Sequence, residues 1–259
     1  MLVAVDVSNT NTKLGVYDGE RLVQHWRLRT APDRTPDEYA VILRGLLAGA
    51  PDVARRVTGA IVASVVPPMN DTIDELLRGV FDTAPIFVGP GVRTGISILM
   101  DNPKEVGADR IVNAVAAFER ARGAAIVVDL GTATTFDYVS AKGEYAGGII
   151  TPGIGISLEA LGARTAKLPR VELVRPPRVV GRNTIHAIQS GVIFGYTALV
   201  DGLVDRIREE NDASAQVYAT GGLAHLIQPE SRTIQRVDEY LTLDGLRIIY
   251  DRNGGRDGE

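Results

Sequence analysis

The chain of 259 residues contains no cysteine, which excludes disulfides, thiol chemistry and cysteine-based zinc sites. Histidine is also scarce, and His25, His186 and His225 are too scattered in the sequence for a histidine-rich metal cluster. Basic tracts are missing, and 28 Lys and Arg residues against 32 Asp and Glu residues give a formal net charge of −4. Nucleic acid is therefore not expected as a partner, because it is bound through clustered positive charge.

Long hydrophobic runs are absent as well. No apolar run approaches the roughly 20 residues that span a membrane. The N-terminus leads directly into a strand-like segment without the basic and apolar regions of a signal peptide. We therefore expect a soluble cytoplasmic protein with no membrane partner. Apolar residues make up 45% of the chain and charged residues 23%, which is typical of a globular protein, and the length suits two modest domains.

Two stretches of the chain repeat one pattern. In residues 2–20 an apolar run ends in Asp6 before a turn of small hydroxyl and amide residues; in residues 125–144 an apolar run ends in Asp129 before a turn of glycine and threonine. Such a turn can surround phosphate oxygens with backbone N–H groups and short hydroxyls, while the aspartate holds a cation or its water. Either stretch alone also fits a common turn, because Asp, Asn and Ser bond to their own backbone. The repetition favours phosphate binding and predicts a duplicated domain with a nucleotide between the halves.

The hydrophobic periodicity gives a similar order of elements in both halves. Three strands with short turns precede a helix, another strand and further helices, which predicts two α/β halves with mixed sheets, residues 1–115 and 116–259. Residues 89–105 are rich in glycine and proline and are expected to form a binding loop. The expected strands are residues 2–7, 13–18, 21–30, 58–66, 84–89, 124–130, 134–141, 145–153 and 216–222. The expected helices are residues 36–49, 69–81, 106–122, 153–164, 183–210, 223–231 and 242–254.

The motifs along the chain resemble those of one family. They are DVSNTNTK at 6–13, SVVPP at 64–68, NPKEVGADR at 102–110, VDLGTATT at 128–135, GGIITPG at 147–153, NTIHAIQSG at 183–191 and ATGGLA at 219–224. In this order they are similar to the motifs of type III pantothenate kinases, which belong to the superfamily of actin-like ATPases, acetate and sugar kinases and Hsp70. The resemblance implies a duplicated actin-like ATPase (ribonuclease H-like) α/β fold with a nucleotide cleft between two mixed-sheet halves. It also implies ATP-dependent phosphorylation of pantothenate to 4′-phosphopantothenate, the first step of coenzyme A biosynthesis.

Asp109 is the expected general base. It begins a predicted helix beside Gly107, whose missing side chain lets a substrate approach the backbone, and the planar guanidinium of Arg110 can hold an anionic or amide end of the substrate. Spacing alone also fits an acidic residue that the helix dipole favours at a helix N-terminus. The resemblance of the VGADR motif favours catalysis and places Gly107, Ala108, Asp109 and Arg110 in the substrate site.

The first turn is expected to bind ATP. Asp6 is expected to position Mg²⁺ through water, since this ion is usually bound by few carboxylates plus phosphate oxygens. Lys13 is expected to face the phosphates as a point charge, with a solvated strand residue as the alternative. In the family the carboxylate matching Asp129 binds K⁺ or NH₄⁺, so the resemblance implies a monovalent cation there. Gly221 and Gly222 are expected to let the backbone lie against the nucleotide. The expected ATP-binding residues are Asp6, Val7, Ser8, Asn9, Thr10, Asn11, Thr12, Lys13 and Thr132, with Thr134 beside the last.

The helix expected at residues 183–210 carries a wide apolar face, which is typical of a helix that packs both inward and across a symmetric interface. Thr184 matches a family residue that reaches the pantothenate pocket of the neighbouring subunit. The resemblance therefore implies a homodimer with a pantothenate pocket shared between its subunits. A plain helix cap at Thr184 and a core helix in a monomer are the alternatives.

Two positions depart from the family's motifs. Ser8 stands where the first loop usually has glycine, and serine would cost on the order of 1 kcal/mol if that position requires a positive φ angle. Met100 stands in the pantothenate pocket where the family usually has tyrosine, and its side chain packs without a hydroxyl's hydrogen bond. Both departures support one alternative, a non-catalytic nucleotide-binding regulatory protein on the same fold. Another small-molecule kinase of the superfamily is a further alternative.

Overall fold

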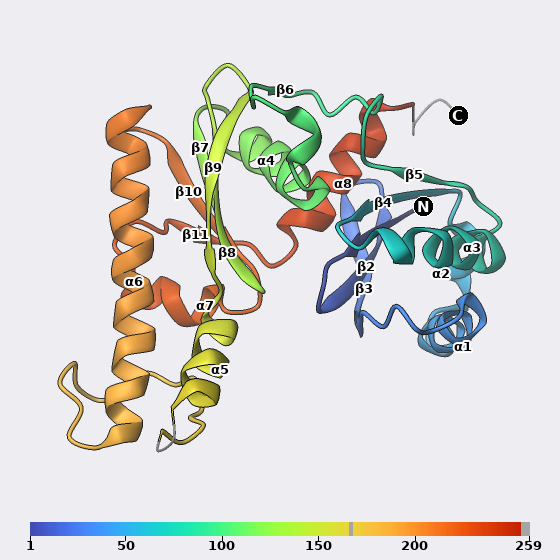
Figure 1. The fold of residues 1–259 in the computed structure, drawn as a ribbon. Helices are drawn as coiled ribbons and strands as arrows, with labels where there is room; N and C mark the ends of the chain where they lie inside the picture. The colour runs from blue at the N-terminus through green and yellow to red at the C-terminus, as the bar shows by residue number, and fades with distance from the viewer. Residues whose placement is uncertain (166–167, 255–259) are drawn as a thin grey trace. The chain divides into compact units, whose positions relative to one another are not determined.

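Two mixed β-sheets form the framework of the protein in a computed structural model that describes residues 1–165 and 168–254 (Figure 1). Contacts divide the chain into two compact units, each assembled from separate stretches. The first unit contains residues 1–96, 101–116 and the chain from residue 242 onward, whereas the second contains residues 97–100 and 117–241. These units are defined by contacts, whereas the predicted halves, 1–115 and 116–259, are defined by a repeated order of elements along the chain. The contacts therefore do not test the boundary at residues 115 and 116, which stays a prediction.

The first sheet has the strand order β3-β2-β1-β4-β5. The β1–β2 and β2–β3 pairs are antiparallel hairpins, and Gly19, with a φ angle of 61°, provides the tight turn of the second hairpin. The β1–β4 and β4–β5 pairs are parallel, and parallel pairing requires crossover connections, which the helices between these strands provide. The strands are β1 (Leu2–Val7), β2 (Asn11–Asp18), β3 (Arg21–Arg29), β4 (Gly59–Ser64) and β5 (Pro85–Phe87).

The second sheet repeats this topology. Its order is β11-β10-β7-β8-β9-β6, with antiparallel β7–β8 and β8–β9 pairs and parallel β7–β10 and β10–β11 pairs. Asp6 is in register with Ala63 of β4, and Asp129 with Thr220 of β10, so both aspartates lie on the central strand of equivalent sheets. The predicted duplication is therefore confirmed. The strands are β6 (Ser97–Ile98), β7 (Ala125–Leu130), β8 (Ala133–Val139), β9 (Glu144–Pro152), β10 (Gln216–Thr220) and β11 (Arg236–Val237).

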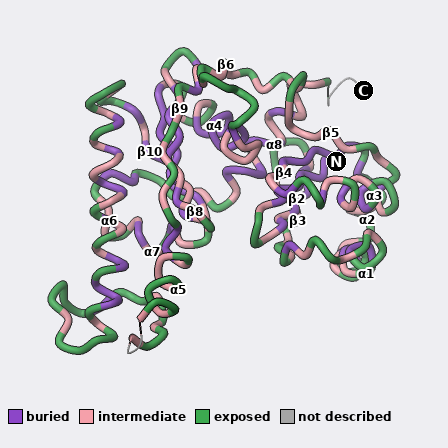
Figure 2. The backbone as a smooth tube through the Cα atoms, viewed as in Figure 1, coloured by how far each residue is buried: buried purple, intermediate pink, exposed green. Residues whose placement is uncertain are grey.

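The helices contribute apolar faces to a core in each unit, and Figure 2 shows the buried residues concentrated on the strands. Helix α1 begins with a capping box, in which the Thr35 hydroxyl accepts from the Glu38 N–H and the Glu38 carboxylate accepts from the Thr35 N–H. The α-helices are α1 (Pro36–Leu47), α2 (Pro51–Arg56), α3 (Asn70–Phe81), α4 (Ala108–Ala121), α5 (Ile154–Arg164), α6 (Thr184–Glu210), α7 (Ala224–Ile227) and α8 (Leu241–Arg252). Short 3₁₀ turns cover Pro67–Met69, Pro103–Glu105 and Gln228–Glu230.

Helix α8 completes the first unit. The Tyr17 hydroxyl of β2 donates to the Asp244 carboxylate at 2.6 Å, and the Thr242 hydroxyl donates to Asn113 of α4 at 2.8 Å. A Cβ at Gly245 would lie 2.2 Å from the Val112 carbonyl oxygen, so the backbones of α8 and α4 are in direct contact. The last described helix therefore supports the helix that carries Asp109.

Helix α6 is long and apolar enough to cross a membrane by length and composition alone, and half of that apolar window is buried within the protein. Most of its predicted apolar face packs inward: Ile188, Val192, Ile193 and Val200 are buried, and Ile185 is the exposed member, at 48%. Most of this apolar face is thus covered by the core of its own chain. Its width does not indicate a second interface.

Candidate active site

The turn between β1 and β2 is compact and presents small side chains. The Ser8 N–H donates to the Asn11 carbonyl at 3.1 Å, which closes the turn and leaves Asn9 and Thr10 exposed at its tip. The Ser8 hydroxyl contacts both carboxylate oxygens of Asp6, at 3.2 and 3.3 Å. The turn thus combines an oriented carboxylate with exposed hydroxyl, amide and backbone groups.

Two predicted members of this turn face inward. The Val7 side chain is buried in the core of the first unit. Thr12 is 1% exposed, and its hydroxyl shares a hydrogen bond with the Thr30 hydroxyl at 3.0 Å. For both residues a direct contact with ATP stays a prediction.

Ser8 adopts a conformation that serine tolerates. Among the described residues, the non-glycine residues with a positive φ angle are Asp82 and Arg122. The backbone at Ser8 therefore does not require glycine, and the conformational cost considered from the sequence does not arise. The serine instead adds a hydroxyl donor to the Asp6 carboxylate.

Asp6, Lys13 and Asp109 form an electrostatic cluster in the first unit. Lys13 is the cross-strand partner of Asp6, and its Nζ lies 3.8 Å from Asp6 Oδ2. Burial raises the pKa of Asp6 to about 6; the Lys13 ammonium opposes this rise and the Asp109 charge adds to it. Burial also raises the pKa of Asp109, whereas Arg110 and Lys13 lower it. The structure therefore brings the predicted base into electrostatic range of the phosphate turn.

The start of α4 fixes the Asp109 carboxylate against its own backbone. The N–H groups of Arg110 and Ile111 both donate to the Gly107 carbonyl, and the Arg110 N–H also donates to Asp109 Oδ1 at 2.8 Å. A Cβ at Gly107 would lie 2.6 Å from Asp109 Oδ1. Any larger residue at position 107 would therefore displace the Asp109 carboxylate from this position.

Two glycines lie close to Asp129: Gly131 in the turn between β7 and β8, and Gly221 directly after β10. A Cβ at Gly221, whose φ angle is +91°, would lie 2.6 Å from Asp129 Oδ1 and 2.7 Å from the Leu130 carbonyl oxygen. A Cβ at Gly131 would lie 3.3 Å from the same carboxylate oxygen. Thr132 is exposed at the tip of this turn, whereas Thr134 is fully buried.

Both aspartates suit the cations expected at them. Among residues 1–165 and 168–254, no group of three or more His, Asp or Glu side chains gathers as a metal-binding cluster. Mg²⁺ near Asp6 would therefore take most of its ligands from phosphate and water, as this ion usually does. The Asp129 carboxylate and the Leu130 carbonyl, both beside Gly221, provide the oxygen donors that suit K⁺.

The predicted substrate residues lie in different elements. Ala108 is the first residue of α4, beside Asp109 and Arg110. Met100 is half-buried, and its sulfur lies 3.5 Å from the Cβ position of Gly147 in β9. Asn183 is the N-cap of α6, with its side chain accepting from the His186 N–H at 2.8 Å, and Thr184 is the exposed first helical residue.

Sequence reasoning did not single out Thr30 or the position of Gly153. The Thr30 hydroxyl donates to the Ser8 carbonyl at 2.7 Å, and the Thr30 N–H donates to the Thr10 carbonyl at 3.1 Å. A Cβ at Gly153 would lie 2.0 Å from the Thr132 carbonyl oxygen. A threonine after a strand is common, so no local signal marks the contact that Thr30 makes.

Comparison with known proteins gives matches over nearly the whole chain. A sequence profile described as type III pantothenate kinase matches residues 2–206. The type III pantothenate kinase of Anaeromyxobacter sp. (strain K) is 56% identical over 253 residues, which are 98% of this chain and 100% of that protein. The type III pantothenate kinase of Myxococcus xanthus (strain DK1622) is 54% identical, over 98% of this chain and 99% of that protein.

Solved structures show the same fold at low sequence identity. A Baf family transcriptional activator from Campylobacter jejuni aligns with a TM-score of 0.61 and 18% identity, over 98% of this chain and 99% of that chain. MreB 5 of Spiroplasma citri bound to AMPPNP aligns with a TM-score of 0.57 and 9% identity, over 99% of this chain and 97% of that chain. The predicted fold class, a duplicated actin-like ATPase fold, is confirmed.

Proposed function

This chain belongs to the type III pantothenate kinase family, and from that premise we propose that Asp109 is the general base for phosphoryl transfer from ATP to pantothenate. The family match and the full-length similarity make the protein a pantothenate kinase, a transferase with ATP and pantothenate as its substrates. We place its product, 4′-phosphopantothenate, at the first step of coenzyme A biosynthesis.

One observation carries the proposed roles: within a single compact unit, Lys13 lies 3.8 Å from the Asp6 carboxylate, and the charges of Lys13 and Asp109 both act on the pKa of Asp6. Phosphoryl transfer needs a phosphate-binding group and a proton acceptor close together, because the attacking hydroxyl must lie in line with the γ-phosphoryl group. An Asp109 that served only as a helix N-terminal acid would not need to lie half-buried within electrostatic range of the phosphate turn.

In the proposed step, the primary hydroxyl oxygen of pantothenate attacks the γ-phosphorus of ATP. The bond from that phosphorus to the bridging oxygen breaks, ADP leaves, and Asp109 accepts the hydroxyl proton. Its raised pKa makes Asp109 a stronger base than an exposed aspartate. Lys13 places positive charge near the transferring group, and Asn9 and Thr10 are positioned at the turn to contact the β- and γ-phosphates.

The proposed pantothenate site is centred on the start of α4. Arg110 holds the anionic or amide end of the substrate, and Gly107 lets the hydroxyl end approach Asp109. Met100 lines the site with a flexible thioether, which adapts its shape to a neighbouring apolar surface. Thr184 of the neighbouring subunit completes the pocket.

The two proposed cations bind at different aspartates, the divalent ion at Asp6 and the monovalent ion at Asp129. Mg²⁺, held through water by Asp6, would supply charge neutralisation on the phosphates, and its charge would also favour the ionised form of this buried carboxylate. K⁺ or NH₄⁺ at Asp129 supports ATP binding by the second turn, to which Thr132 contributes. That both turns bind one nucleotide stays a prediction.

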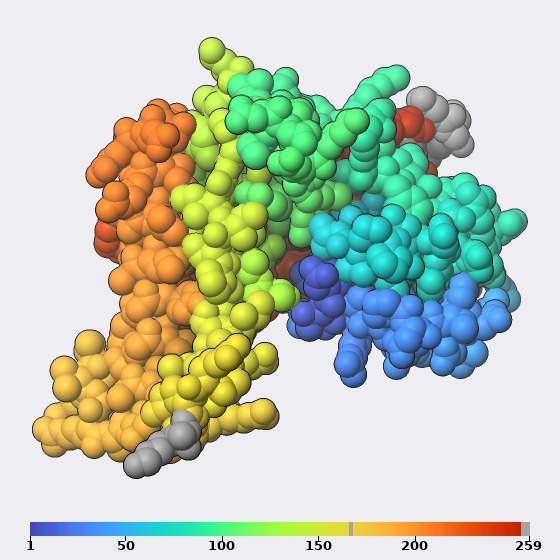
Figure 3. All heavy atoms as spheres, viewed as in Figure 1, coloured from blue at the N-terminus to red at the C-terminus, as the bar shows by residue number. Residues whose placement is uncertain are grey.

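The proposed homodimer rests on exposed apolar residues of the second unit. Figure 3 shows the segment 168–180 and the adjacent end of α6 projecting from the body of that unit. Hydrogen bonds from Gln189 and Ser190 of α6 hold this segment at the Glu172 and Val179 carbonyls. Its exposed apolar surface beside Thr184 is typical of an interaction site. Its exposed apolar residues are Val174, Val179 and Val180, to which α5 adds Ile156 and Leu161 and α6 adds Ile185.

We place the enzyme in the cytoplasm, where ATP and pantothenate are both available. The alternative of a regulatory protein without turnover loses support at Ser8, because that residue needs no positive φ angle. The regulatory alternative is then supported by Met100 alone. The geometry favours no second function.

Replacement of Asp109 by Asn is the direct test of the proposed function. We expect Asp109→Asn to lower kcat by roughly 10²-fold or more, the usual effect of losing a general base, with ATP affinity and thermal stability nearly unchanged. The assay measures ADP formation with Mg²⁺ and K⁺, with and without pantothenate.

Asp71→Asn is a matched control, since Asp71 is an exposed acid in the first turn of α3. It should leave turnover unchanged. Near wild-type turnover in Asp109→Asn, or an equal loss in both variants, would remove Asp109 from the role of base.

A further inference from the structure

Thr30 connects the end of β3 to both sides of the first phosphate turn. Its hydroxyl donates to the Ser8 carbonyl at 2.7 Å, and its N–H donates to the Thr10 carbonyl at 3.1 Å. Thr30 is only 7% exposed, and its hydroxyl also shares a hydrogen bond with Thr12. The exposed tip of the turn, Asn9, therefore lies between two carbonyl groups that a single buried residue fixes.

The residue equivalent to Thr30 in the second half also contacts the turn beside it, through a close backbone approach rather than a hydroxyl. Asn11 of β2 is in register with Arg29 of β3, and Ala133 of β8 is in register with Pro152 of β9. The residues that follow these third strands are Thr30 and Gly153, so they are equivalent in the duplicated topology. A Cβ at Gly153 would lie 2.0 Å from the Thr132 carbonyl oxygen and 2.7 Å from the Gly131 carbonyl oxygen. In both halves, the residue after the third strand touches the backbone carbonyls of the phosphate turn.

Contacts to carbonyl oxygens also fix backbone donors. A peptide unit is planar and trans, so its C=O and N–H groups point in opposite directions. When Thr30 holds the Ser8 carbonyl on the inner side of the turn, the N–H of Asn9 points to the outer, exposed side. Backbone N–H groups in such turns are the donors that bind phosphate oxygens.

We propose that Thr30 is a positioning residue for ATP: through the Ser8 carbonyl, it fixes the Asn9 N–H in the orientation that binds a phosphate group. This inference rests on the proposed role of the β1–β2 turn in phosphate binding. A purely structural role would make Thr30 important for stability alone. The proposed role makes it important for ATP and not for pantothenate.

Thr30→Val is the informative variant, because valine has nearly the shape of threonine without the hydroxyl and keeps the backbone N–H. We expect the KM for ATP to rise about five- to tenfold, the scale of one lost hydrogen bond, with the KM for pantothenate within about twofold of wild type. Thr30→Ser should restore most of the ATP affinity. Calorimetric titration with a non-hydrolysable ATP analogue measures the same loss without turnover.

Thr197→Val is the matched control for stability. Thr197 is also 7% exposed, and its hydroxyl donates to the Ile193 carbonyl at 2.8 Å within α6. It should lower thermal stability as much as Thr30→Val does while leaving the KM for ATP unchanged. An unchanged ATP affinity in folded Thr30→Val, or equal losses for both substrates, would overturn the positioning role.

Lys13→Ala separates this inference from the proposed function. If Lys13→Ala leaves the KM for ATP unchanged, the β1–β2 turn does not bind the phosphates and the proposed function of the turn fails. If Lys13→Ala raises the KM for ATP and Thr30→Val does not, the turn binds ATP and only the role of Thr30 fails.

Discussion

Asp6 and Asp129 end equivalent strands, yet their carboxylates have different surroundings. Asp6 is 2% exposed, carries a raised pKa of about 6 and lies close to a lysine. Asp129 is partly exposed and is flanked by Gly131 and Gly221 at the turn. A buried carboxylate with a neighbouring cation suits indirect binding of a divalent ion, whereas a carboxylate beside backbone carbonyls suits a larger monovalent ion.

Activity is therefore expected to depend on K⁺ or NH₄⁺ through Asp129. Turnover should fall when buffers contain Na⁺ or Tris as the only monovalent cations. Asp129→Asn should lower activity about tenfold, the scale of one lost charge-assisted contact, and should remove the response to K⁺. The measurement is the initial rate of ADP formation across a series of chloride salts at constant ionic strength. Equal wild-type rates in all salts would contradict a cation site at Asp129.

For single residues, the sequence predicts which side chains act at the site better than it predicts the burial and contacts of those side chains. Asp109 and Lys13 are recognisable from their motifs, but the burial that raises the pKa of Asp109 depends on tertiary packing around α4. The close approach of the Asp109 carboxylate to Gly107 depends on the Asp109 rotamer, which the sequence does not specify. Thr30 donates to a carbonyl group in the turn between β1 and β2, which is distant in sequence, so its neighbours in sequence reveal nothing of that contact.

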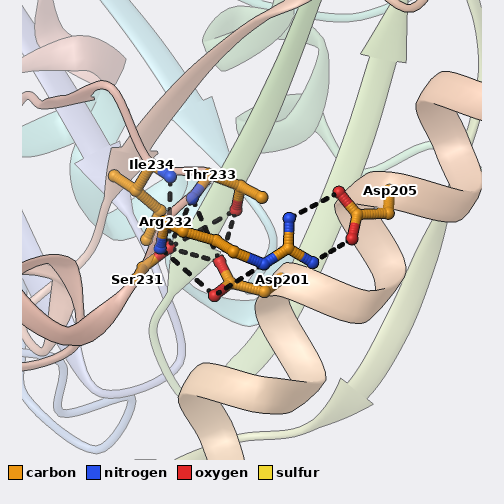
Figure 4. A network of polar contacts seen from close by, with 6 residues as sticks. All are labelled: Asp201, Asp205, Ser231, Arg232, Thr233 and Ile234. Atoms are coloured by element: carbon orange, nitrogen blue, oxygen red, sulfur yellow. Dashed lines mark hydrogen bonds and ion pairs between the residues drawn. The ribbon is translucent and has the colours of Figure 1, made fainter.

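Among the secondary-structure elements, α6 adds to its apolar packing a set of hydrogen bonds at one buried carboxylate, Asp201. Figure 4 shows Asp201 of α6 receiving hydrogen bonds from the loop that leads to β11. The Ser231 hydroxyl donates to it at 2.6 Å, the Thr233 hydroxyl at 2.7 Å, and the Arg232 N–H at 3.2 Å. Burial raises the pKa of Asp201, but these hydrogen bonds outweigh burial and lower its pKa below the usual 3.8.

Asp201→Asn is expected to lower the free energy of unfolding by about 2 kcal/mol, since it replaces hydrogen bonds to a charged acceptor. A depressed folded-state pKa stabilises the protein above the unfolded-state pKa, and this contribution is lost as pH falls through the folded value. The difference between wild type and variant should therefore be full near neutral pH and shrink below about pH 4. Chemical denaturation at several pH values measures it.

Asp205→Asn is the matched control on the same helix. Asp205 forms an ion pair with Arg232, and its side chain is 34% exposed. Exposed ion pairs contribute little, so this variant should lose less than about 1 kcal/mol. Equal losses in Asp201→Asn and Asp205→Asn, or a difference that persists at low pH, would contradict the role assigned to Asp201.

The long and central elements were predictable from the sequence, as were the short β5 and α7, whereas α2, β6 and β11 were not. Strands β1, β4 and β7 are continuous apolar runs, and α3, α4 and α6 have clear helical spacing, so their bounds agree with the prediction within a few residues. The expected loop at 89–105 contains β6 and a 3₁₀ turn, and β6 exists because it pairs with β9. Two-residue β11 likewise depends on β10, and α2 has no buried residue to produce a pattern.

At the scale of the whole molecule, the proposed dimer makes each pocket depend on two chains. In this proposal Asp109 of one subunit and Thr184 of the neighbouring subunit belong to the same pocket. Two inactive variants that damage different chains of the same pocket should therefore complement each other when their subunits exchange. Complementation distinguishes a shared pocket from a dimer whose pockets are independent.

Mixing Asp109→Asn with Thr184→Trp should restore activity to about a quarter of the wild-type level. Random exchange makes half of the dimers mixed, and each mixed dimer contains one pocket with both defects and one with neither. The rate is measured after exchange has been verified by mass spectrometry of tagged subunits.

Mixing Asp109→Asn with Lys13→Ala is the control, because both residues belong to the first unit of one chain. No intact pocket forms in that mixture, so no activity should return. Recovery absent from the first mixture despite exchange, or a monomer by sedimentation at assay concentration, would rule out the shared pocket.

The return of α8 to the first unit reverses the order in which the two units are completed during synthesis. Residues 117–241 leave the ribosome as one stretch and can form the second sheet without waiting for later chain. The first unit emerges earlier, yet Asn113 and Tyr17 lack Thr242 and Asp244 until the whole second unit has been translated. A nascent chain that stops before α8 therefore lacks the hydrogen bond and backbone contact that α8 makes with α4, the helix that carries Asp109.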